Sequence, residues 1–64
     1  MYKLTIKQKN LLLGVKYDDC QYFNPVQDIN SRWFVSAEEV RDTTNADFLW
    51  VKDLTLGDYQ IDNN

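Results

Sequence analysis

The sequence predicts a small, mainly β, α+β domain: a twisted antiparallel sheet or a small open barrel of five to six short strands, with one short helix near residues 37–42. Three observations support this. Short runs of alternating apolar and polar residues recur, turn-forming residues separate them, and a helix-capping signature spans residues 36–39. A chain of 64 residues is long enough for one domain, covering residues 1–64.

The first part of the chain predicts a β-hairpin. The run 2-YKLTIK-7 alternates strictly between apolar and polar residues, which is typical of a half-buried strand. Residues 8–10 are polar and suit a turn. The run 11-LLLGVKY-17 then places Leu12 on the opposite face from its two leucine neighbours, as expected for a second strand.

A second hairpin is predicted after a turn at residues 18–19. Residues 20–27 form a less regular segment, and Pro25 has no N–H to donate, so a strand there is an edge strand or ends at the proline. The composition of 28-DINS-31 suits a turn. The run 32-RWFVS-36 predicts the partner strand.

A capping box predicts the helix. The Ser36 hydroxyl can accept from the N–H of Glu39, and the Glu39 carboxylate can accept from the N–H of Ser36. Residues 42–45 are poor helix formers and provide the stop. The sequence therefore predicts about two helical turns over residues 37–42.

The run 46-ADFLWVKD-53 has two interpretations. Its phenylalanine, tryptophan and valine favour a strand, which we prefer. The alternative is a helix beginning at residues 44–45, which would align Phe48, Val51 and Leu54 in one stripe. Residues after 53 alternate again around a predicted turn and complete the strand count.

Composition excludes several kinds of site. The single cysteine, Cys20, and the absence of histidine rule out an intrachain disulfide and an ordinary zinc site. Without histidine, the usual base that activates a nucleophile is missing. The two glycines, Gly14 and Gly57, are too few for a phosphate-binding loop. We therefore expect no metal, no cofactor and no enzymatic activity.

The short apolar runs and the single cysteine also bear on where in the cell the protein is located. The longest apolar runs are far too short to cross a membrane, and a secreted domain of this size is normally rich in cysteine. We expect a cytoplasmic protein. Its net charge of -3 combines a basic segment, residues 1–16, with an acidic remainder. Small acidic chains without histidine are common on phages and mobile elements, so the composition is compatible with a protein of such an element.

The predicted strands place large apolar side chains on both faces of the sheet. A chain of this length has little material to cover both. We therefore expect an interaction module that binds another protein or a second copy of itself, with Trp50, Phe48, Phe34 and Leu12 near the contact.

Two other functions stay open. Single-stranded nucleic acid is bound by aromatic platforms beside a basic groove, and the first hairpin would supply Lys3, Lys7 and Lys9. The third possibility is an acidic mimic of nucleic acid that inhibits a DNA- or RNA-binding enzyme. The negative net charge disfavours the nucleic-acid binder, because positive charge dominates phosphate binding.

Overall fold

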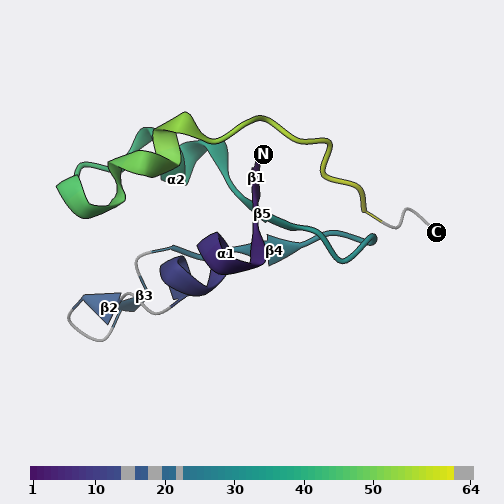
Figure 1. Ribbon diagram of the computed structural model, residues 1–64, viewed down its shortest axis with the longest axis horizontal. Coiled ribbons are helices and arrows are strands. Elements are labelled where there is room, and N and C mark those ends of the chain that lie inside the picture. Colours follow the sequence, from purple (N-terminus) through teal and green to yellow (C-terminus); the bar gives the residue numbers. More distant parts are fainter. Residues whose placement is uncertain (14–15, 18–19, 22, 62–64) are drawn as a thin grey trace.

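The protein has a small α+β fold (Figure 1). The computed structural model describes residues 1–13, 16–17, 20–21 and 23–61. Strands β1, β5 and β4 form an open antiparallel sheet with β5 in the middle, and β2 pairs separately with β3. In chain order the elements are β1 (Tyr2–Leu4), α1 (Ile6–Leu13), β2 (Lys16–Tyr17), β3 (Cys20–Gln21), β4 (Val26–Gln27), β5 (Trp33–Val35), α2 (Ala37–Arg41) and η1, a 3-10 helix (Ala46–Asp53).

The α+β class is confirmed, but the prediction of a mainly β domain is wrong. The main sheet has three strands instead of five or six, and it is open. Helices occupy two of the segments that were predicted to contain strands. In both segments a helix forms instead of a strand because capping hydrogen bonds stabilise the start of the helix.

The predicted first hairpin does not form, because α1 replaces its turn and part of its second strand. The hydroxyl of Thr5 accepts from the N–H of Gln8 at 3.1 Å, and the Gln8 side chain accepts from the N–H of Thr5 at 2.8 Å. This reciprocal pair is a capping box that starts a helix at Ile6. The predicted strand 11–17 is helical to Leu13 and extended only in β2, while residues 14–15 lie outside the described residues.

The second hairpin is confirmed. β4 pairs antiparallel with β5, with Gln27 opposite Trp33. β4 starts directly after Pro25 and lies at the edge of the sheet, as a proline at that point requires. Ser31 has a positive φ of 64° in the connecting turn. The turn predicted at residues 18–19 lies outside the described residues.

The capping box of α2 is also confirmed. The N–H of Glu39 donates to the Ser36 hydroxyl at 3.1 Å, and the N–H of Ser36 donates to the Glu39 carboxylate at 3.4 Å. The helix ends at Arg41 with Asp42 as its C-cap, within a residue of the predicted end.

The preferred strand over residues 46–53 is wrong, and the helical alternative is right. Asn45 caps η1 by accepting from the N–H of Asp47 at 2.9 Å. The turns that follow place Val51 fully inside, with Phe48 and Leu54 packed beside it, which is the stripe expected of a helix. Local capping therefore overrides the strand preference of the aromatic residues.

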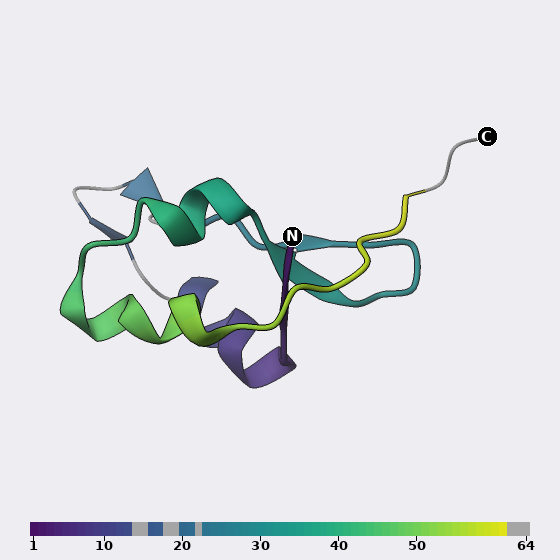
Figure 2. The same ribbon diagram turned by 90° about the horizontal axis from the view of Figure 1, so that it is seen from above.

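One face of the sheet holds the main core. Side chains of β1 and β5 on this face meet the buried side chains of all three helices. Figure 2 shows α2 and η1 running alongside each other next to the sheet. The core consists of Leu4, Leu12, Phe23, Val35, Val40 and Val51.

The opposite face is covered by residues 55–61, which we call the C-terminal strap. It runs from the end of η1 past β1 toward the β4–β5 turn (Figures 1 and 2). The N–H of Lys3 donates to the carbonyl of Thr55, and the N–H of Gly57 donates to the carbonyl of Met1, both at 3.0 Å. These bonds bracket one antiparallel pairing, between Tyr2 and Leu56. The strap therefore lies against β1, although it does not form the two strands predicted after residue 53.

Phe34 is the residue that the strap buries. It points away from Val35 on the central strand, and its side chain is fully buried. The Tyr59 ring meets it edge-on, with 5.4 Å between ring centroids and an interplanar angle of 89°. The strap thus encloses the aromatic side chain that the helices cannot reach.

Candidate interaction surface

The outward side of α1 is unusually apolar for a surface helix. Leu12 is the one residue of this helix that is fully buried, while Ile6 is 67% exposed, Leu11 52% and Leu13 38%. Ile6, Asn10 and Leu13 follow the spacing of a single helical stripe. We call this side the outer face of α1, and it comprises Ile6, Lys7, Asn10, Leu11 and Leu13.

The residues singled out in the sequence do not form one surface. Phe34 and Leu12 are fully buried and offer no exposed side chain. Phe48 and Trp50 are half-buried and pack against the core on the helical side of the sheet. The Phe48 ring contacts Phe23, with centroids 5.8 Å apart at an angle of 63°. The core and the strap therefore cover much of the surface of the four side chains for which the sequence predicted a binding partner.

The exposed aliphatic residues of α1 were missed because their segment was interpreted as a hairpin. In that arrangement Leu11 and Leu13 face inward and Leu12 outward, which is the reverse of the structure. The signal that reveals the helix is present in the sequence as the capping box from Thr5 to Gln8. A helical period then places Leu12 on the inner side, between Gln8 and Lys9, as the one apolar residue there.

The three lysines proposed for nucleic-acid contact lie on different parts of the molecule. Lys3 is on the strap side of the sheet, where its β-carbon approaches Gly57. Lys7 is exposed on the outer face of α1. Lys9 places its ammonium 4.7 Å from the centre of the Trp33 ring, which packs against the core on the helical side. The lysines therefore do not line one groove, and Lys9 covers an aromatic ring that a base would use.

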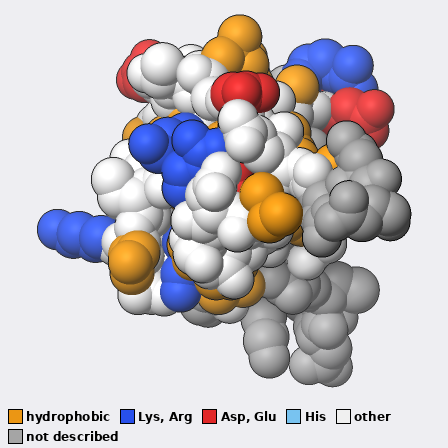
Figure 3. All heavy atoms as spheres, turned by 90° about the vertical axis from the view of Figure 1, so that its right-hand side faces the viewer, with side chains coloured by type: hydrophobic (Ala, Val, Ile, Leu, Met, Phe, Trp, Pro, Cys, Tyr) orange, Lys and Arg blue, Asp and Glu red, His pale blue; other side chains and the backbone are white. Residues whose placement is uncertain are grey.

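Among the described residues, those at the end of the molecule that carries the β4–β5 turn form no continuous patch of one kind. Figure 3 shows its lysine and arginine side chains in separate groups, and its hydrophobic side chains are likewise scattered between polar atoms. Ile29 and Ile61 are among the exposed aliphatic residues of the protein. Single exposed aliphatic residues of this kind are common on protein surfaces.

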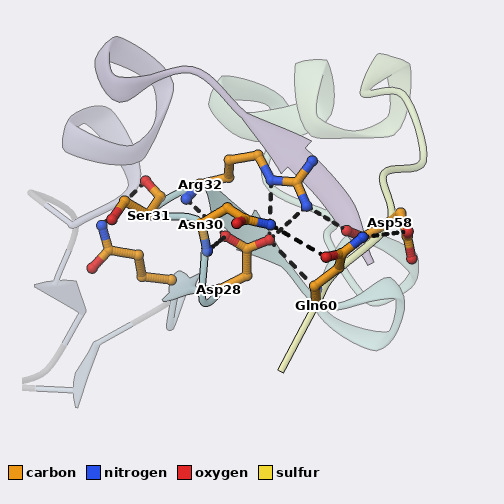
Figure 4. A network of polar contacts seen from close by, with 7 residues as sticks. Asp28, Asn30, Ser31, Arg32, Asp58 and Gln60 are labelled. Carbon is orange, nitrogen blue, oxygen red and sulfur yellow. Dashed lines mark hydrogen bonds and ion pairs between the residues drawn. The ribbon is translucent and has the colours of Figure 1, made fainter. Parts of the chain in front are cut away.

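A polar network at the β4–β5 turn centres on Asp28 (Figure 4). Its carboxylate accepts from the backbone N–H groups of Asn30 and Arg32 at 3.0 and 2.9 Å. The Arg32 guanidinium donates to the second oxygen through two nitrogens, at 3.0 and 2.7 Å. Gln60 of the strap adds a backbone N–H at 3.4 Å.

The surroundings of Asp28 determine its pKa. Burial alone would raise the pKa, since it disfavours the charged carboxylate. The carboxylate accepts hydrogen bonds from the Arg32 side chain and from the backbone of Arg32 and Gln60, and it lies near the positive charge of Arg32. Together these interactions outweigh the effect of burial. They lower the pKa of Asp28 from an ordinary 3.8 to about 2. Asp28 is thus a fully bonded structural carboxylate that joins the turn to the strap.

A shallow hollow of about 430 Å³ lies between β1, the start of α1 and the end of η1. Lys3 and Asp53 bring opposite charges to its rim, and both are exposed to solvent. The side chains of Thr5 and Gln8 also line it, but they are engaged in the capping box. The hollow therefore lacks a buried polar group with which to fix a ligand.

The part of the chain that the structure describes has no orphaned buried side-chain nitrogen or oxygen. Within the same residues, no three potential metal-ligating side chains gather. None of the helices there combines the length and the hydropathy that a membrane span requires. Comparisons with protein-family models, characterised proteins and solved structures give no match. The surface itself is therefore the basis for any functional proposal.

Proposed function

We propose that the protein is a small non-catalytic interaction module that self-associates through the outer face of α1. The observation that carries this proposal is the exposure of Ile6, Leu11 and Leu13 on one short helix. Burying a large aliphatic side chain completely contributes about 1.5–3 kcal/mol. Ile6 and Leu13 share one stripe and therefore gain together when a partner covers them, while Leu11 lies at the far edge of the face, about 140° around the helix from Ile6.

A second copy of the chain is the partner that this surface fits. Asn10 lies near the middle of the stripe that joins Ile6 and Leu13. If two copies of α1 pack antiparallel about a two-fold axis near Asn10, Ile6 of each copy meets Leu13 of the other. The two Asn10 amides then face each other and can exchange hydrogen bonds. Lys7 remains at the rim, where its charge stays solvated.

The size of the surface indicates a weak dimer. A helix of eight residues is about 12 Å long. Stable interfaces bury about 1,200–2,000 Å² in total, which is more than so short a helix provides by itself. We therefore expect reversible association that becomes visible only at high protein concentration.

Sedimentation equilibrium from micromolar to millimolar protein tests the proposal. The wild type should show an increase in mass with concentration that is insensitive to salt, because the contact is apolar. The double variant Ile6→Ser/Leu13→Ser should remain monomeric, while Ile29→Ser, which removes an exposed isoleucine from the distant turn, should behave as the wild type does. A monomeric wild type across the whole range would refute self-association, and a dimer that survives the double variant would exclude the outer face of α1.

Salt dependence also separates this proposal from nucleic-acid binding. Affinity for a labelled single strand would fall steeply with added salt and would depend on Lys3, Lys7 and Lys9. The placement of these lysines on different faces gives that function no specific support. For the acidic-mimic function, Glu38, Asp47 and Asp53 are exposed, but Asp28 and Glu39 are engaged in internal hydrogen bonds.

A further inference from the structure

The C-terminal strap is attached to the protein with little burial of its own side chains. Leu56 and Ile61 are 66% and 58% exposed, and the partly buried residues of the strap are Gly57 and Tyr59. The remaining attachments are hydrogen bonds, many of them through the strap backbone. A segment held in this way opens more easily than a segment anchored by buried side chains.

The surface under the strap has the features of a peptide-binding edge. β1 offers the N–H of Lys3 to an extended chain, and Met1, just before β1, offers its carbonyl. Such backbone groups are the basis of binding by strand addition. Beside them lies the ring of Phe34. Arg32 donates to the carbonyl of Asp58 at 2.8 Å, and the N–H of Ile29 donates to the carbonyl of Gln60 at 2.9 Å.

Two positions of the strap make this surface selective. A β-carbon at position 57 would lie 2.7 Å from Cε1 of Phe34 and 3.1 Å from Cβ of Lys3, so only glycine fits without a shift. Two residues later, Tyr59 meets the edge of the same phenylalanine ring. A bound peptide therefore needs glycine at the first of these positions, and an aromatic residue two positions on reproduces the contact of Tyr59 with Phe34.

We propose that the strap is exchangeable, and that the surface formed by the edge of β1, Phe34 and the β4–β5 turn also binds the strap of a second copy of this chain. The contacts are the same whether the strap comes from its own chain or from another, which is the condition for exchange of an element between protomers. The strap leaves η1 through Leu54, whose backbone is extended. The chain's own strap has the advantage of a high effective concentration, so exchange becomes visible when that strap is weakened.

A fluorescent peptide of residues 54–61 tests this on the full-length protein. In the Gly57→Ala chain the protein's own strap no longer fits over Phe34, so the surface is open to the peptide in trans. We expect the wild-type peptide to bind this variant at least tenfold more tightly than it binds the wild-type chain. The matched control is the same peptide carrying Gly57→Ala, which should not bind either protein. A folded Gly57→Ala chain that fails to bind the wild-type peptide, or binds both peptides equally, would overturn the proposal.

Hydrogen exchange of the wild-type protein tests whether the strap opens, and it does not depend on the Gly57→Ala variant. If the strap opens, the amides of Lys3 and Gly57 should exchange well before the amides of the β1–β5 pair. Exchange of all these amides at one common rate, through global unfolding, would show that the strap does not release and would overturn the proposal. Because α1 packs on the core side of the sheet and the strap lies on the Phe34 side, Ile6→Ser/Leu13→Ser in the protein should leave peptide binding unchanged, which separates this surface from the self-association through α1.

Discussion

Gly57 lies so close to Phe34 that a β-carbon on the glycine would stand 2.7 Å from Cε1 of the phenylalanine ring. Phe34 is fully buried and therefore has little room to move aside. This contact links the strap to the central strand of the sheet. It makes position 57 sensitive to the smallest possible increase in size.

We expect Gly57→Ala to lower the free energy of unfolding by about 1–3 kcal/mol, which is the usual cost of overpacking. Urea denaturation followed by tryptophan fluorescence measures it. In a Phe34→Leu background, where the aromatic ring is absent, the same substitution should cost much less. An equal cost in both backgrounds would show that the contact with Phe34 is not the cause.

Adjacent leucines of α1 should respond differently to truncation. Leu12→Ala removes a fully buried side chain and is expected to cost about 2–5 kcal/mol. Leu11→Ala removes an exposed side chain, so the monomer should lose less than about 0.5 kcal/mol. Denaturant unfolding at low protein concentration compares the two. A hairpin over this segment would reverse the order, so the pair also tests the helix.

The stability that Asp28 contributes should disappear in acid. Its pKa is depressed in the folded protein, so the folded state binds a proton less readily than the unfolded state does. The contribution is therefore complete above the ordinary pKa of 3.8 and is lost as the pH falls toward about 2.

Asp28→Asn isolates that contribution from those of the other titrating groups. The variant should be less stable than the wild type at neutral pH, since its amide nitrogen cannot accept from Arg32. Urea unfolding of both proteins between neutral pH and pH 2 should show the gap narrowing below about pH 4. A constant gap would mean that the charge of Asp28 is unimportant.

The N-cap of α2 offers a further local test. Ser36→Ala removes the hydroxyl that accepts from the N–H of Glu39, and we expect a loss of about 0.5–2 kcal/mol. Thr44→Ala serves as the control, since Thr44 is an exposed threonine outside the helices. Thermal unfolding by circular dichroism should separate the two variants. Equal melting temperatures would indicate that the cap contributes nothing measurable.

The sequence predicted those elements whose signals are local and unambiguous. The capping box from Ser36 to Glu39 marks the start of α2 correctly. Pro25 marks the edge strand, because a residue without an N–H is excluded from the middle of a sheet. The turn at residues 28–31 connects the two strands of the confirmed hairpin.

Two helical segments were predicted as strands because competing signals overlap in them. The alternation of residues 2–7 is genuine only as far as Leu4, since Thr5 and Gln8 form a capping box immediately afterwards. In η1 the strand preference of the aromatic residues competes with a cap at Asn45 and with burial of Val51. In both segments the helical cap prevails over the propensity of individual residues.

The site was harder to predict than the fold. The apolar bulk of Phe34 seemed to need a partner because nothing in the sequence shows that the strap returns across the sheet to cover it. That return depends on contacts between opposite ends of the chain, such as the bond from Gly57 to Met1. Patterns within short windows of sequence carry no information about such contacts.

Placement of the strap also has a consequence for biosynthesis. A ribosome makes the chain from its N-terminus, so the residues of β1, α1 and β5 emerge before residues 57–59. Until then the ring of Phe34 has neither Gly57 nor Tyr59 above it. Before the strap docks, the Phe34 ring has the Arg32 guanidinium beside it on this face, 5.6 Å from its centroid, but no strap over it, so a chaperone or a neighbouring chain can reach the ring.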